Sequence, residues 1–99
     1  MPSVARLGDK SSGHGCCYTP TPLIQASNNV FVNEIGVARS GDKFAIHGGC
    51  IDHQPDQDYV NSRNATVFVN GKAIARKGDS VGPKVSDIAE GSPNVFSGG

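Results

Sequence analysis

The sequence lacks the features that mark several large functional classes. Its nine basic and nine acidic residues leave no net charge, so nothing argues for binding to nucleic acid or to an anionic membrane surface. No apolar run approaches the roughly 18 residues that a membrane span needs. The first residues, Met-Pro-Ser-Val-Ala-Arg, lack the apolar core of a secretory signal. We therefore expect a chain made in the cytoplasm without a signal peptide and no nucleic-acid partner.

Leucine and pairable cysteines are also scarce. Leucine occurs only at Leu7 and Leu23, whereas thirteen glycines and six prolines punctuate the chain, a balance that favours short strands and tight turns over helices. The three cysteines form an odd set, and a disulfide between the adjacent Cys16 and Cys17 would be strained. We expect no disulfide framework. A chain of 99 residues is expected to form one domain, residues 1–99, near the size at which a core needs extra stabilisation.

One sequence unit occurs three times. Its first marker reads Val-Ala-Arg or Ile-Ala-Arg, then any residue, then Gly-Asp, and it occupies residues 4–9, 37–42 and 74–79. Its second marker is a Val-Phe strand at residues 30–32, 67–69 and 95–96. Such self-similarity indicates one supersecondary unit used repeatedly. The fold class that we expect is all-β, a small domain of three β-hairpin repeats with pseudo-threefold symmetry.

The turns of the hairpins differ between the repeats. Asn70-Gly71 is the strongest short-range signal for a two-residue turn, because both residues tolerate a positive φ. Asn33-Glu34 occupies the same place in the preceding copy, and glutamate is a poor occupant of a left-handed position. We therefore expect that turn to be wider or bulged.

The third hairpin is divided between the two ends of the chain. The strand that begins at Val4 has no preceding Val-Phe partner, and Val95-Phe96 has no following one; pairing them predicts neighbouring termini. Within each hairpin, side chains alternate between two faces, so Phe31 and Phe68 lie opposite the flanking valines. The phenylalanines are most simply core or hairpin-packing residues, and the alternative is an apolar face at the base that contacts a partner.

Three candidate metal ligands lie close together in the second repeat. His47, Cys50 and His53 are evenly spaced, and imidazole and thiolate are the donors that zinc prefers. A structural tetrahedral site needs four ligands, and the remaining histidine is His14. The working hypothesis is one closed site made by His14, His47, Cys50 and His53.

The repeat register supports part of this set. His14, His47 and Lys84 each lie five residues after the aspartate of their repeat, so a threefold arrangement would bring them together. Protonated lysine does not ordinarily bind a metal ion. Cys50 and His53 would supply the ligands that the third repeat lacks at Lys84. The roles of Cys16 and Cys17 stay open: they are either competing metal ligands or small buried apolar residues.

The arginine and aspartate of each repeat could be read as a catalytic pair. They lie three residues apart in all three copies, at Arg6 and Asp9, Arg39 and Asp42, and Arg76 and Asp79. Chemistry usually needs one unique constellation, so the repetition favours a structural ion pair at a turn.

The thrice-used Ala-Arg-x-Gly-Asp motif, alternating with Val-Phe-Val-Asn-Gly and loop histidines, resembles the PAAR-repeat family over essentially the whole chain. The tetrapeptides that match the family's Pro-Ala-Ala-Arg are Ser3-Val4-Ala5-Arg6, Gly36-Val37-Ala38-Arg39 and Ala73-Ile74-Ala75-Arg76. The alanine and arginine are present, and the proline is not.

The resemblance implies a small cone-shaped domain with a metal at its vertex. This domain would form the pointed tip on a trimeric spike of the VgrG or phage tail-spike type, with one copy of this chain per trimer. Such spikes belong to type VI secretion systems and contractile phage tails, so the tip would reside on a virion or a secretion spike and touch the target membrane transiently. Family members bind zinc through three histidines and one cysteine, the set assembled above. Zn2+, one per chain, suits these donors better than iron. Any effector cargo would be held non-covalently.

Two other functions compete with the tip. Asp52 could serve as a base beside an open zinc position in a small hydrolase, but four protein ligands make a closed structural site. The sequence also has no nucleophile elbow, glycine-rich phosphate loop or His-Glu-x-x-His motif. A free-standing zinc-binding adaptor is the third reading. We expect a protein that is not an enzyme and has no catalytic residue.

Overall fold

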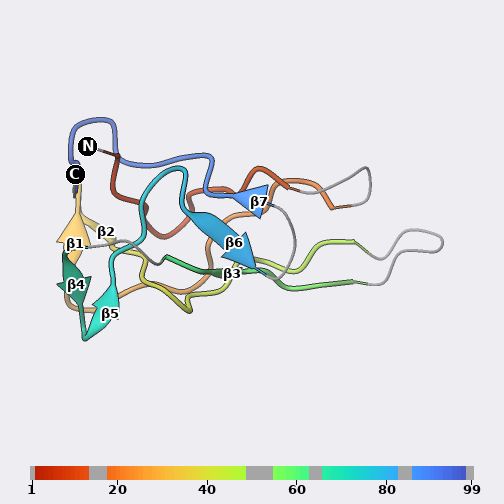
Figure 1. The fold of residues 1–99 in the computed structure, drawn as a ribbon, viewed down its shortest axis with the longest axis horizontal. Coiled ribbons are helices and arrows are strands. Elements are labelled where there is room, and N and C mark those ends of the chain that lie inside the picture. The colour runs from red at the N-terminus through yellow and green to blue at the C-terminus, as the bar shows by residue number, and fades with distance from the viewer. Residues whose placement is uncertain (1, 14–17, 49–54, 63–65, 83–85, 98–99) are drawn as a thin grey trace.

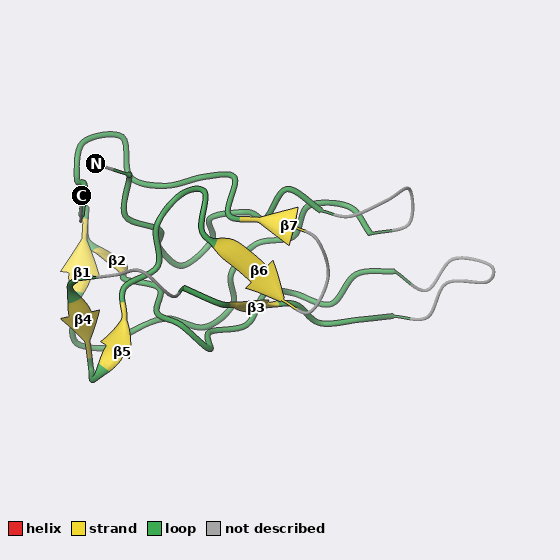
Figure 2. Ribbon diagram, viewed as in Figure 1, coloured by secondary structure: helices red, strands yellow, loops and turns green. Residues whose placement is uncertain are grey.

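The computed structural model describes residues 2–13, 18–48, 55–62, 66–82 and 86–97. The described chain is all-β and contains no helix, with loops joining very short strands (Figure 2). The principal extents of the molecule are 40 × 24 × 24 Å. In the described ranges no helix has the length and apolar character needed to cross a bilayer.

In the described residues, seven short strands form three small antiparallel sheets. The strands are β1 (Phe31–Val32), β2 (Ile35–Gly36), β3 (Tyr59–Val60), β4 (Phe68–Val69), β5 (Lys72–Ala73), β6 (Ser80–Gly82) and β7 (Ser86–Asp87). Strands β1 and β2 form one hairpin, β4 and β5 form another, and β6 lies between β3 and β7. Both hairpins gather at the end of the long axis where the two termini lie (Figure 1).

The two internal hairpins have the same two-residue turn. Val32 pairs with Ile35 in one hairpin, and Val69 pairs with Lys72 in the other. Each turn therefore consists of two residues, Asn33-Glu34 in the first and Asn70-Gly71 in the second. Glu34 adopts a left-handed φ of 66°, close to the 77° of Gly71. The expectation of a wider turn at Asn33-Glu34 was therefore wrong. The strand register fixes the turn length, and glutamate accepts an unfavourable conformation to satisfy it.

The termini build the third hairpin, as the sequence predicted. Ser3 pairs with Phe96 in the position that β2 and β1 occupy in the first hairpin. The Val4 amide donates to the Val95 carbonyl at 3.0 Å, and the Ser97 amide donates to the Pro2 carbonyl at 3.0 Å. The first and last segments of the described chain therefore form one structural unit.

The three Ala-Arg segments bind one another in a closed ring of backbone hydrogen bonds. Ala5 donates to Ala75 at 2.9 Å, Ala75 donates to Ala38 at 3.0 Å, and Ala38 donates to Ala5 at 3.0 Å. None of these alanines has any exposed surface. A larger side chain would have no space at the point where three backbones converge, which explains why the small residue recurs.

Each Ala-Arg segment ends in the same turn. Gly8, Gly41 and Gly78 have φ angles of 91°, 94° and 92°, which only glycine adopts without strain. The arginine and aspartate on either side form an ion pair in every repeat: Arg6 with Asp9 at 3.2 Å, Arg39 with Asp42 at 2.9 Å, and Arg76 with Asp79 at 3.5 Å. The predicted ion pair at a turn is therefore present in all three repeats.

The core consists of two clusters stacked along the molecule. The smaller cluster, beside the hairpins, contains Val4, Val37, Val69 and Ile74. The larger one joins the alanine ring to Leu23, Phe44, Val60, Val81 and Ile88. Burial of each of the larger aliphatic side chains contributes about 1.5–3 kcal/mol to stability.

The repeated phenylalanines lie outside the core. Phe31, Phe68 and Phe96 are 57%, 62% and 47% exposed, whereas the valine after each of the first two packs inward. The part of the interpretation that placed these phenylalanines in the core was therefore wrong, whereas packing within the hairpins stays a prediction. Strand alternation separates the two faces but does not say which of them is buried.

Candidate metal centre

A pair of extended segments carries the candidate centre away from the hairpins. Residues 43–48 and 55–58 run antiparallel toward the opposite end of the long axis (Figure 1). Their register is set by a bridge between Lys43 and Tyr59 and by another between His47 and Asp56. His47 and Asp56 exchange both backbone hydrogen bonds, at 3.0 and 2.8 Å. Directly opposed residues project their side chains to the same face, so the imidazole and the carboxylate meet.

Three side chains converge at this point. His47 Nε2 lies 2.5 Å from Asp56 Oδ1 and 3.3 Å from Asp58 Oδ2. Asp56 and Asp58 are two residues apart on one extended segment, so both face the histidine. One potential ligand atom from each of the three residues lies within 4.8 Å of the others. His47, Asp56 and Asp58, called the His-Asp-Asp group below, could hold a metal ion.

The surroundings of the His-Asp-Asp group are largely dry. Asp58 is 1% and His47 7% exposed, and the edge of the Tyr18 ring packs against the imidazole with the centroids 5.2 Å apart. The Asp56 side chain is 20% exposed as a whole, but its two carboxylate oxygens are buried. A charge in such an environment interacts more strongly with its neighbours than it would in water.

A backbone contact orients the histidine. Nδ1 lies 2.7 Å from the Thr19 carbonyl, and because a carbonyl only accepts, Nδ1 is the donor there. If Nε2 carries a proton, it donates to the neighbouring carboxylates; if it does not, its lone pair faces them and can bind a metal ion. This arrangement is typical of metal-binding histidines, in which the second ring nitrogen is held by a carbonyl or carboxylate.

The spacing of the donors fits a cation after a small adjustment. Two ligands at about 2.1 Å from a tetrahedral ion lie about 3.4 Å apart. The 3.3 Å separation between His47 Nε2 and Asp58 Oδ2 already matches this value. The 2.5 Å contact with Asp56 is a hydrogen-bond distance and must lengthen by about 1 Å, which the partly exposed Asp56 side chain can do by rotation.

Only one of the four ligands expected from the sequence lies in the described chain. His47 is there, buried and oriented toward potential ligands. His14, Cys50 and His53 lie outside the described residues, so their approach to His47 stays a prediction. Cys16, Cys17, Lys84 and Asp52, the last being the proposed base of a hydrolase, also lie outside them.

Asp56 and Asp58 were not singled out from the sequence. Their signal is an i, i+2 pair of carboxylates on an extended segment, which places both side chains on one face. Recognising them also required the pairing of His47 with Asp56 across the intervening loop, and no local pattern encodes that register. The histidine and cysteine motif drew attention to ligands close in sequence rather than to those across the strand pair.

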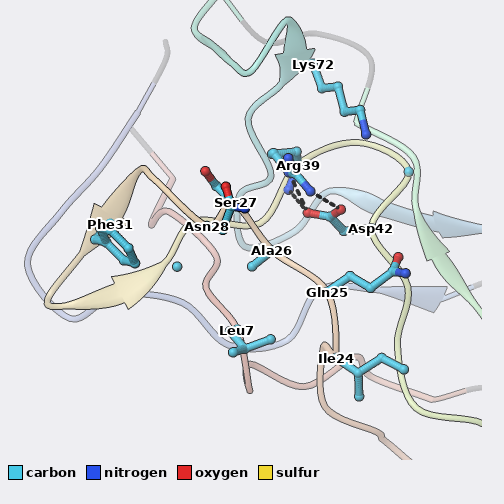
Figure 3. A pocket seen from close by; sticks show the side chains of 12 residues that line it. Leu7, Ile24, Gln25, Ala26, Ser27, Asn28, Phe31, Arg39, Asp42 and Lys72 are labelled. Atoms are coloured by element: carbon cyan, nitrogen blue, oxygen red, sulfur yellow. Dashed lines mark hydrogen bonds and ion pairs between the residues drawn. The ribbon is translucent and has the colours of Figure 1, made fainter.

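A groove of about 600 Å³ lies on the side of the molecule, near the first hairpin. Leu7, Ile24 and Phe31 give it an apolar rim, and Arg39 and Asp42 form one wall (Figure 3). Arg39 donates hydrogen bonds to the Asp42 carboxylate, and these raise the pKa of Arg39 above its ordinary value. Burial lowers this pKa, and the negative charge of Asp42 raises it by a smaller amount. Among the described residues that line the groove, Arg39 and Asp42 therefore already pair with each other.

Comparison of the chain with protein-family models and with curated proteins found no match.

Proposed function

We propose that this protein is a structural spike tip of the PAAR-repeat type. It would form a cone with pseudo-threefold symmetry that caps and sharpens the trimeric β-helical spike of a type VI secretion system or a contractile phage tail. The observation that carries this proposal is the ring of Ala5, Ala38 and Ala75, in which three copies of one motif make equivalent hydrogen bonds. A single chain built this way offers three similar faces to a partner with true threefold symmetry.

The proposed docking surface is the apolar end formed by the three hairpins. Phe31, Phe68 and Phe96 hold equivalent places in the three units and are about half exposed or more. Exposed aromatic side chains at the centre of a surface are typical contributors to binding energy. Their recurrence in every repeat favours a partner that presents the same pocket three times, as a homotrimer does.

Metal binding would stabilise the narrow end. The apolar core clusters lie among the hairpins and the middle of the chain, and the segments that carry His47 extend beyond them. An ion held there can join loops that few apolar contacts hold together. We propose Zn2+ as this ion, with His14, His47, Cys50 and His53 as the ligand set that the family resemblance implies. The contact of His47 Nδ1 with the Thr19 carbonyl leaves Nε2 available to bind the ion, which supports His47 as a ligand.

The proposed action is mechanical rather than catalytic. The tip would lead the spike through a target envelope and meet the membrane only in passing. Non-covalent carriage of an effector is compatible with this role. The satisfied ion pairs of the three repeats, each explained by its turn, support the assignment of no catalytic residue.

Co-purification with a candidate trimeric spike tests the proposal. Native mass spectrometry should find one copy of this chain per spike trimer. Phe68→Ser should weaken the complex at least about tenfold, since a buried aromatic anchor commonly contributes more than 1.4 kcal/mol to binding. Ile46→Ser is the matched control, because Ile46 is 63% exposed but belongs to the segment that extends away from the hairpins. Equal numbers of the two chains, or equal loss of binding in both variants, would reject the docking model.

A further inference from the structure

Asp58 is buried at a position where the other two repeats have hydroxyl side chains, Thr21, which is also buried, and Ser86, which is half-buried. The Phe44 amide donates to the Asp58 carbonyl at 2.9 Å, just as the Ser11 amide donates to the Thr21 carbonyl at 3.0 Å. In the third repeat the corresponding pair is Val81 and Ser86. The repeat itself therefore does not require a carboxylate at this level of the fold.

A carboxylate at this level is costly unless something compensates it. Asp58 is 1% exposed, and burial of an ionised carboxylate costs several kcal/mol unless a cation or strong donors stabilise it. His47 Nε2 and the Asp56 carboxylate lie beside it. When a metal ion takes the place of a proton on Nε2, the imidazole is neutral and the two aspartates carry two negative charges, which a divalent cation matches.

We infer that His47 Nε2, Asp56 and Asp58 are direct ligands of a divalent cation at the narrow end of the molecule. The inference rests on the proposed function for the purpose of the metal, which is to stabilise this end of the molecule. It replaces the ligand set proposed there: His47 is kept, and Asp56 and Asp58 take the place of His14, Cys50 and His53. One imidazole and two carboxylates suit a borderline ion such as Zn2+. They supply too few oxygens for Ca2+, which takes six to eight, and are too hard for copper(I).

This donor set and the histidine and cysteine set have only His47 in common. They make opposite predictions about whether a sulfur atom binds the metal. Thiolate ligation gives a bound Co2+ ion an intense sulfur-to-metal charge-transfer absorption, whereas nitrogen and oxygen donors do not. Cobalt commonly replaces zinc in such sites without changing their ligands. The test is therefore a Co2+ titration of the full chain after chelator treatment, followed by calorimetry and by absorption spectroscopy.

Asp58→Asn and Asp56→Asn should each weaken Co2+ binding at least about tenfold, the lower end of what loss of a supporting or direct ligand costs. Asp87→Asn is the matched control, since Asp87 is an exposed aspartate on β7, and its affinity should stay within about twofold of the unmodified chain. Cys50→Ser should also leave the affinity within about twofold. The cobalt spectrum should lack the sulfur band.

Two results would overturn the inference. One is an intense sulfur band that disappears in Cys50→Ser while both asparagine variants bind as tightly as the unmodified chain, which would establish the sulfur-containing set instead. The other is the absence of Co2+ binding by the unmodified chain. If Asp58→Asn fails to fold, Asp56→Asn decides alone, because the Asp56 side chain is partly exposed. Spike binding is measured separately, so failure here leaves the docking proposal standing.

Discussion

The amide of Ala38 donates a 3.0 Å hydrogen bond to the carbonyl of Ala5, its counterpart in the first repeat. Neither side chain has exposed surface, so the two backbones meet with space for a methyl group only. We expect Ala38→Leu to lower the free energy of unfolding by about 1–3 kcal/mol through overpacking, as measured by urea denaturation. Ala89 is exposed, and Ala89→Leu should change stability by less than about 0.5 kcal/mol. Equal stability of both variants would mean that the ring tolerates larger residues.

Phe44 and Phe68 test the division between core and docking surface with one chemical change. Phe44 is fully buried and Phe68 is 62% exposed. Phe44→Ala should cost about 3–5 kcal/mol of stability because it leaves a cavity, whereas Phe68→Ala should cost less than about 1 kcal/mol. Thermal and urea denaturation measure both. A large loss of stability in Phe68→Ala would show that this ring serves the fold, which would weaken the case for a docking role.

Glu34 holds a left-handed conformation that glycine adopts at the matching position in the second hairpin. Its φ is 66°, and that of Gly71 is 77°. A residue with a Cβ pays about 1–2 kcal/mol for this conformation, so Glu34→Gly should stabilise the protein by about 0.5–1 kcal/mol after the added chain entropy of glycine. The reciprocal Gly71→Ala should destabilise it by about 1 kcal/mol, although a Cβ at Gly71 would meet nothing within 4 Å. The same sign of change in both variants would contradict the strain argument.

The repeats explain why so much of the β architecture could be predicted. Three copies of Ala-Arg-x-Gly-Asp fix the turns at Gly8, Gly41 and Gly78, and the spacing to each Val-Phe strand fixes the hairpins and the pairing of the ends. Each of these features depends on residues close in sequence or on comparison of one copy with another. Local sequence carries that information directly.

Other features depend on relationships that no single segment contains. The outward face of Phe31 is set by what packs against the opposite face of its strand, and Glu34 is strained because register outweighs local preference. Asp56 reaches His47 through a strand pairing that the histidine and cysteine spacing does not reveal. The candidate site was therefore only partly foreseen, with His47 in common.

The pairing of Ser3 with Phe96 makes the chain a candidate for circular permutation. Internal hairpins have two residues between their last paired positions, Val32 with Ile35 and Val69 with Lys72. Joining residue 99 to Pro2 would leave Gly98-Gly99 as an equal link, and glycine pairs suit such turns. New ends placed between Asn70 and Gly71 would open a hairpin tip, where chain breaks are best tolerated.

This permutant should fold with a β-type circular dichroism spectrum and a free energy of unfolding within about 1 kcal/mol of the original chain, because it loses mainly exposed contacts of Asn70. A second permutant, opened between Ser40 and Gly41, is the control. That cut separates Arg39 from Asp42 and disturbs the bond from the Gly41 amide to the Val60 carbonyl, so it should lose several kcal/mol or fail to fold. The opposite outcome would be a control that folds and a hairpin permutant that does not. It would contradict the equivalence of the terminal hairpin with the two internal ones.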